Sequence, residues 1–120
     1  LGNHGSYVID PNECNPLFRE KGDKVVVLEY INRGKLPGFR EIADGSKLLL
    51  DMVINTIRRD GLVVFCSHDA IIMAFIAHYL KYDFNKMDWL GFLEGPLIFE
   101  EEGCIKILFR DMQLEIEDWE

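Results

Sequence analysis

Residues 62–80, LVVFCSHDAIIMAFIAHYL, contain two apolar runs that are separated by three polar residues. The first run, Leu62 to Cys66, is continuous, which is typical of a strand buried on both faces of a parallel sheet. The second, Ala70 to Leu80, has the length of a helix and is apolar almost all round, which predicts a buried crossover helix. The polar residues 67–69 would then lie at the joint between strand and helix.

That joint is a favourable place for an anion. In an open parallel sheet, ligands bind beyond the carboxyl ends of the strands, and the following helix points its free N–H groups and positive dipole end at the same place. Phosphate is a common occupant. The His68 imidazole can donate a hydrogen bond to a phosphate oxygen, and Asp69 can protonate a departing alkoxide. A simpler interpretation is that Ser67 or Asp69 caps the helix and that His68 is an ordinary loop histidine.

The region before this segment predicts loops and one long helix. Residues 1–24 are rich in Gly, Asn, Asp and Pro and are expected to form loops. Val25 to Tyr30 fits either a short strand or the start of a helix. Arg40 to Arg59 is predicted to be a helix, and its expected apolar face is Ile42, Leu48, Leu49, Met52, Val53 and Ile57.

The region after it predicts a hairpin. Leu97 to Glu100 and Cys104 to Phe109 flank Glu101-Glu102-Gly103, in which Gly103 is expected to take a positive φ. The acidic tail QLEIEDWE is expected to lie at the periphery. Together these segments predict an α/β fold with a mostly parallel sheet, flanking helices and a C-terminal hairpin.

Length and charge narrow the classes of protein. A chain of 120 residues fits a single domain over residues 1–120. The net charge of −8 argues against binding to nucleic acid or to anionic membranes. A membrane span over 62–80 is disfavoured, because an aspartate at depth costs about 2.5–3.5 kcal/mol. Three well-separated cysteines, Cys14, Cys66 and Cys104, indicate reduced thiols and a cytoplasmic location.

FCSHDAIIMAFIAHYL, residues 65–80, resembles the second catalytic motif of the histidine phosphatase superfamily, which has the phosphoglycerate-mutase-like fold. In that family a buried strand ends in Ser-His, and a helix of small and aliphatic residues follows. The His68-Asp69 dipeptide is similar to the form in the acid phosphatase branch, where the aspartate is the proton donor. Arg40–Arg59 is similar to the family's preceding helix, and 97–109 looks like its closing strands.

The resemblance implies a phosphomonoester hydrolase that acts on a phosphorylated small molecule without a metal or an organic cofactor. In the family, a histidine of an Arg-His-Gly motif attacks phosphorus, and a second histidine stabilises the transferring oxygens. By this resemblance His68 is the second histidine, Asp69 is the acid, and Ser67 joins His68 in binding phosphate.

The Arg-His-Gly motif itself does not occur in the sequence. The nearest stretch, Asn3-His4-Gly5, lacks both the arginine and a preceding strand. We therefore expect the chain to be the C-terminal part of a larger phosphatase domain, inactive alone, whose nucleophile lies upstream of Leu1. An open sheet edge would favour a homodimer. Two alternatives are a non-catalytic phosphatase-like binding module and an unrelated α/β domain whose Ser-His-Asp is only a helix cap.

Other conspicuous side chains are expected to have structural roles. The set comprises His78, the helix-surface residues Arg40, Arg58 and Arg59, the acidic rim Glu94, Glu100, Glu101 and Glu102, and the packing residues Trp89, Phe92 and Trp119. The acidic rim could in principle bind a cation, but a solvated hairpin edge explains it more simply.

Overall fold

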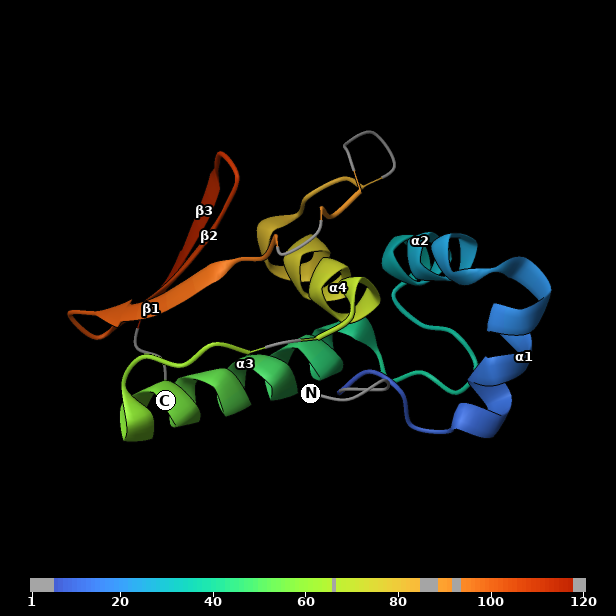
Figure 1. Cartoon of the computed structure of the whole chain (residues 1–120), viewed down its shortest axis with the longest axis horizontal. Coiled ribbons are helices and arrows are strands. Elements are labelled where there is room, and N and C mark those ends of the chain that lie inside the picture. Colours follow the sequence, from blue (N-terminus) through green and yellow to red (C-terminus); the bar gives the residue numbers. More distant parts are fainter. Residues whose placement is uncertain (1–5, 66, 85–88, 92–93, 118–120) are drawn as a thin grey trace.

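The computed structural model describes residues 6–65, 67–84, 89–91 and 94–117. Helices precede strands along these residues (Figure 1). The elements are α1 (Pro11–Lys21), α2 (Asp23–Arg33), α3 (Ile42–Asp60), α4 (Asp69–Leu80), β1 (Leu97–Glu101), β2 (Cys104–Phe109) and β3 (Met112–Ile116). The three strands form an antiparallel sheet in the order β1-β2-β3. The mixture of helices and sheet agrees with the prediction, whereas the mostly parallel sheet is wrong.

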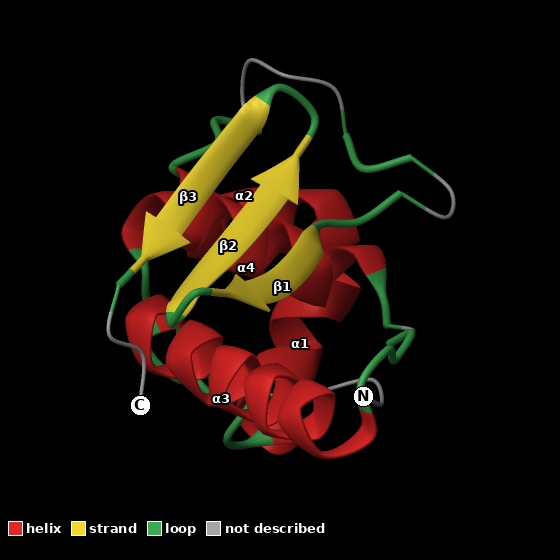
Figure 2. Ribbon diagram, turned by 90° about the vertical axis from the view of Figure 1, so that its left-hand side faces the viewer, coloured by secondary structure: helices red, strands yellow, loops and turns green. Residues whose placement is uncertain are grey.

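Helix α4 lies at the centre of the fold. It contacts α2, α3 and β3, and the sheet lies in front of it in the view of Figure 2. Seven of its twelve residues are buried, which confirms the prediction of a buried helix over Ala70–Leu80. It does not connect parallel strands, because the strands that the structure describes are all antiparallel and follow it in the chain. Among the described residues, no helix is both long and apolar enough to cross a membrane.

The strand predicted over Leu62–Cys66 is wrong for the part of it that the structure describes. Leu62 is 94% exposed and Val64 is 83% exposed, and residues 62–65 belong to no strand. An apolar run becomes a buried strand only where neighbouring strands pair with it. Here the sheet is built from the C-terminal residues alone, so this segment simply links α3 to α4. Cys66 lies outside the described residues.

The N-terminal region is helical where loops were predicted. Asp10 accepts the N–H of Asn12 on its Oδ1 at 3.0 Å, and Pro11 is the first residue of α1. An acidic N-cap followed by proline is a standard helix start, because it satisfies a free N–H and presets the backbone. Residues 1–5, including the His4 stretch, lie outside the described residues.

Helix α2 decides between the two interpretations of residues 25–30. Its buried face consists of Val26, Val27 and Tyr30, which follow helical spacing. The helix ends at Gly34, which has a φ of 78° and donates its N–H to the Tyr30 carbonyl at 2.7 Å. The positive φ explains why glycine stands at position 34, since this left-handed conformation is strained for other residues.

Helix α3 confirms the predicted long helix within two residues of its expected start. Its buried face, however, is rotated from the predicted one: Leu48 and Met52 are 47% and 38% exposed, whereas Ser46 is fully buried. Tyr7 covers one end of this buried face, where it packs on the helix and shares a 2.7 Å hydrogen bond between its hydroxyl and Ser46 Oγ. Gly45 leaves the space that the Tyr7 ring fills.

The C-terminal hairpin is confirmed, with Gly103 at a φ of 80°. Side chains of β2 alternate, so that Ile105, Ile107 and Phe109 face the core. The tail that was expected to be peripheral contributes β3, which pairs with β2 through a two-residue turn at Arg110-Asp111. Residues 118–120 lie outside the described residues.

Candidate functional site

His68 occupies the N-cap position of α4. Its backbone is extended, with a φ of −84° and a ψ of 152°, and its carbonyl accepts the N–H groups of Ile71 at 3.1 Å and Ile72 at 3.2 Å. Its side chain is exposed and makes no capping hydrogen bond. The imidazole therefore lies at the surface beside the positive end of a 12-residue helix.

Asp69 is the first helical residue, and both of its carboxyl oxygens accept hydrogen bonds. Oδ1 accepts the N–H of Ala70 at 2.8 Å, and Oδ2 accepts the indole N–H of Trp89 at 2.9 Å. The N–H of Asp69 itself has no acceptor within the described ranges. Asp69 thus satisfies one donor of the first turn while another stays available to a ligand.

Ser67 is half-buried and differs from its neighbours. Its Oγ is shielded from solvent and has no hydrogen-bond partner in the part of the chain that the structure describes. Such groups are uncommon, because burying a hydroxyl without a partner is unfavourable. The cap position belongs to His68, so Ser67 does not cap the helix as the simpler interpretation proposed.

Trp89 joins this site from a segment distant in sequence. It packs against the core as a partly buried side chain, as predicted, and its indole N–H also donates to Asp69. The Nζ of Lys24, on α2, lies 5.3 Å from the centroid of the Trp89 ring, a cation–π arrangement. Lys24 forms no ion pair with the acidic residues that are described, so its charge is not neutralised there. Phe92 and Trp119 lie outside the described residues.

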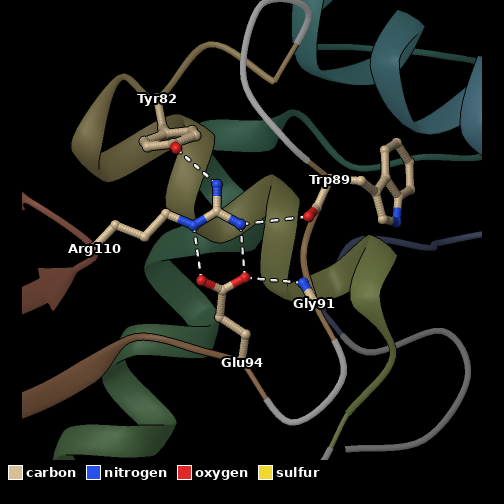
Figure 3. Close-up of polar contacts among 5 residues, drawn as sticks. All are labelled: Tyr82, Trp89, Gly91, Glu94 and Arg110. Atoms are coloured by element: carbon tan, nitrogen blue, oxygen red, sulfur yellow. Dashed lines mark hydrogen bonds and ion pairs between the residues drawn. The ribbon is translucent and has the colours of Figure 1, made fainter.

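The backbone around Trp89 is held by an ion pair between Arg110 and Glu94 (Figure 3). Arg110 donates from Nε to Glu94 Oε2 at 2.7 Å and from Nη2 to Oε1 at 2.6 Å. It also donates to the Tyr82 hydroxyl at 2.7 Å and to the Trp89 carbonyl at 3.3 Å. Gly91 donates its N–H to Glu94 at 2.9 Å. These donors, Arg110 first, lower the pKa of Glu94 to about 2.

The other acidic residues of the predicted rim have separate partners. Glu100 accepts a hydrogen bond from Arg58 Nε at 2.9 Å, and Glu101 pairs with Lys106 at 3.1 Å. No group of three or more candidate metal ligands occurs among the residues that are described. Glu94 is therefore part of a tertiary contact rather than of one continuous rim.

The remaining candidate basic residues do not join His68 in any described contact. Arg40 donates from Nε to the Ser6 carbonyl at 2.9 Å, and Arg59 pairs with Asp60 at 2.9 Å. His78 lies on the last turn of α4, about 15 Å along the helix from His68 at the usual rise per residue. Burial lowers the pKa of His78, which fits a structural role.

A small cavity of about 40 Å³ lies beneath the first turns of α4. Ala70, Ile71 and Ala74 form one wall. The rest is formed by side chains of the N-terminal segment, α1, α2 and the loop between α2 and α3. This volume holds only a few water molecules. The polar residues 67–69 do not line it, so their site is an open surface at the helix end.

Sequence reasoning located the polar residues at the start of α4 but missed Lys24, Trp89 and Arg110. These three residues are far apart in the sequence and form no local motif, so only the fold brings them together. Comparison of the chain with protein-family models, curated proteins and solved structures gave no match. Its function therefore has to be argued from its own residues.

Proposed function

We propose that the chain is the His68-bearing part of a phosphomonoester hydrolase of the histidine phosphatase type, acting on a phosphorylated small molecule. The observation that carries this proposal is the exposed His68 at the N-cap of α4, with Asp69 directly after it. The resemblance of residues 65–80 to the family's second motif assigns these two residues the roles of phosphate ligand and proton donor.

The local chemistry supports binding of a phosphate dianion. Three groups meet at the start of α4. The backbone N–H of Asp69 and the His68 imidazole are hydrogen-bond donors, and the helix dipole adds partial positive charge. The Lys24 ammonium adds a cation from a second helix. A local positive site of this kind is compatible with a chain whose net charge is −8.

In the proposed reaction His68 and Asp69 have different roles. His68 would stabilise negative charge on the transferring phosphoryl oxygens, and Asp69 would give its proton to the leaving alkoxide as the ester bond breaks. The attacking nucleophile is not part of the proposal for these residues, because the sequence has no Arg-His-Gly motif. We therefore expect the chain by itself to bind phosphate with little or no turnover.

Phosphate binding can be tested on the chain as it stands. Inorganic phosphate and orthovanadate should raise the melting temperature, since a ligand that binds only the folded state stabilises it. They should also shift the amide resonance of Ala70. His68→Ala should weaken both responses, while His78→Ala, a matched histidine at the other end of α4, should not. If neither anion shifts Ala70, or if both variants behave alike, the proposal is wrong.

A second candidate is a module that binds a phosphorylated ligand without hydrolysing it. It is favoured by the two hydrogen bonds that already engage both oxygens of Asp69. Hydrolysis of aryl and alkyl phosphates, assayed on the longest polypeptide that the gene encodes, separates the two. Under the hydrolase proposal, Asp69→Asn slows alkyl esters, whose leaving groups need a proton, far more than aryl esters. Phosphate binding without any hydrolysis would select the binding module.

A further inference from the structure

We propose that Trp89 is a positioning residue for Asp69 and that the Glu94–Arg110 pair holds Trp89 in place. The inference rests on the proposed function, because it concerns the same anion site. Its starting observation is the 2.9 Å hydrogen bond from the Trp89 indole N–H to Asp69 Oδ2. Nothing in the sequence around either residue indicates this contact.

The indole N–H is a donor only, so it can act on the carboxylate in a defined way. It fixes one oxygen of Asp69, while the Ala70 N–H fixes the other. It also places the positive end of a polar bond against the carboxylate, which offsets part of its negative charge. Without the indole, the Asp69 carboxylate would turn more freely and repel a phosphate dianion at the start of α4 more strongly.

The Glu94–Arg110 pair fixes the backbone that directly follows the Trp89 side chain. Arg110 reaches the Trp89 carbonyl, and Glu94 accepts the N–H of Gly91 two residues later. In Figure 3 the indole points away from this ion pair, so the pair contacts the backbone and leaves the indole N–H available to Asp69. Arg110 also anchors the assembly to Tyr82, just after α4.

The residue type at position 110 supports a dedicated role for this side chain. Arg110 has a φ of 51° in a two-residue hairpin turn. Glycine, asparagine and aspartate are the residues that such turns favour, because other side chains are strained at positive φ. An arginine at this position is explained by its four hydrogen bonds to Glu94, Tyr82 and Trp89.

The chain offers a matched control for the ion pair. Arg58 and Glu100 form an equally bidentate contact between α3 and β1, with side chains 41% and 29% exposed. Arg110 and Glu94 are 24% and 32% exposed. Partly exposed pairs contribute little to stability, so removing either should leave the fold intact. If only removal of the Glu94–Arg110 pair affects the Trp89 indole, the effect therefore comes from positioning of Trp89 and not from a loss of stability.

The first experiment is a double-mutant cycle in which inorganic phosphate is the probe and Ala70 the reporter. Trp89→Phe keeps an aromatic ring for Lys24 and removes the N–H; it should weaken phosphate binding roughly two- to fivefold, the size of an exposed polar contact. Asp69→Asn should strengthen binding, because it removes a like charge. In the Asp69→Asn background, Trp89→Phe should have no further effect, since the indole acts through the carboxylate. Additive effects of the two substitutions would overturn the inference.

The second experiment follows the Trp89 indole N–H resonance without any ligand. Asp69→Ala, which removes the acceptor, and Glu94→Gln should shift it and speed its hydrogen exchange, whereas Glu100→Gln should leave it unchanged. An indole signal that responds to none of these, or equally to Glu94→Gln and Glu100→Gln, refutes positioning. This measurement separates the positioning role of Trp89 from the proposed function, because it needs no phosphate. If the indole resonance responds as expected but the chain binds no phosphate, only the proposed function is rejected.

Discussion

Replacing Gly45 by alanine should destabilise the protein, although the same change in most helices is stabilising. Alanine is favoured over glycine in a helix interior by up to about 1 kcal/mol. A Cβ at position 45, however, would lie 2.8 Å from Cε1 of Tyr7 and 3.2 Å from the Ser6 carbonyl oxygen. Ordinary carbon contacts at such a Cβ are 3.4–4 Å, so the ring would have to move.

The ring has little room for that movement. Tyr7 is 3% exposed, its hydroxyl shares a hydrogen bond with the buried Ser46, and its ring packs edge-on against Tyr30 at 5.9 Å between centroids. Overpacking a close-packed site costs about 1–3 kcal/mol. Weakening the buried hydrogen bond adds to this, and the gain in helix propensity offsets part of it. We therefore expect a net loss of about 1–2 kcal/mol.

Urea unfolding followed by circular dichroism measures this loss, which corresponds to about 4–8 °C in melting temperature for a domain of this size. Asn55→Ala is the control, because Asn55 is exposed on the same helix and its replacement should be neutral or stabilising by a few tenths of a kcal/mol. A Gly45→Ala protein as stable as the parent would show that Tyr7 does not pack on α3. The placement of Tyr7 in the wall of the cavity beneath α4 would then be wrong as well.

Two further predictions concern titratable groups. Because Arg110 lowers the pKa of Glu94 from 4.5 to about 2, the stability that this pair contributes should be fully present above pH 4.5 and be lost as the pH falls towards 2. The loss should be at most about 1 kcal/mol, since the pair is partly exposed, and Glu94→Gln should abolish it in acid titrations of stability. Cys14 is fully buried and burial raises the pKa of its thiol, so iodoacetamide should modify Cys104 before Cys14 in peptide mass spectrometry of the native protein.

The elements that sequence reasoning predicted correctly are those with strong local signals. Gly103 at the hairpin turn and the uninterrupted apolar run of α4 each specify one structure without help from distant residues. Helix α3 was predicted in extent, but its buried face was not, because packing against α4, β1 and Tyr7 decides which side faces the core. Tertiary packing determines such rotations, and the helical period alone cannot.

The candidate site was predictable only in part, for a similar reason. His68 and Asp69 stand out because they interrupt an apolar sequence, and the start of α4 was predicted within one residue. The indole donor to Asp69 comes from the segment after α4, and the cation over that indole, Lys24, comes from α2; both are single side chains with no motif. Helix α1 was missed although Asp10-Pro11 is a start signal, because Pro16 reads as a helix breaker and yet lies inside the helix.

The sharpest disagreement between sequence and structure concerns residues 62–65, and one substitution tests it. If Val64 belonged to a buried strand, Val64→Lys would place a charge in the core and unfold the protein. Because Val64 is 83% exposed, we expect Val64→Lys to change stability by no more than about 0.5 kcal/mol. Val53→Lys is the matched control: Val53 is 6% exposed on α3, and the same change there should abolish cooperative unfolding.

The result also bears on what positions His68. If Val64→Lys is tolerated, no strand end holds His68. The position of His68 then depends on α4, because its carbonyl accepts hydrogen bonds from the N–H groups of Ile71 and Ile72. Contacts such as that between Trp89 and Asp69 would then supply the rigidity that a strand end was expected to give. If Val64→Lys unfolds the chain as Val53→Lys does, the segment is buried in solution. The exposure of residues 62–65 described above would then be wrong, and His68 and Asp69 would have to be placed at the end of a strand instead.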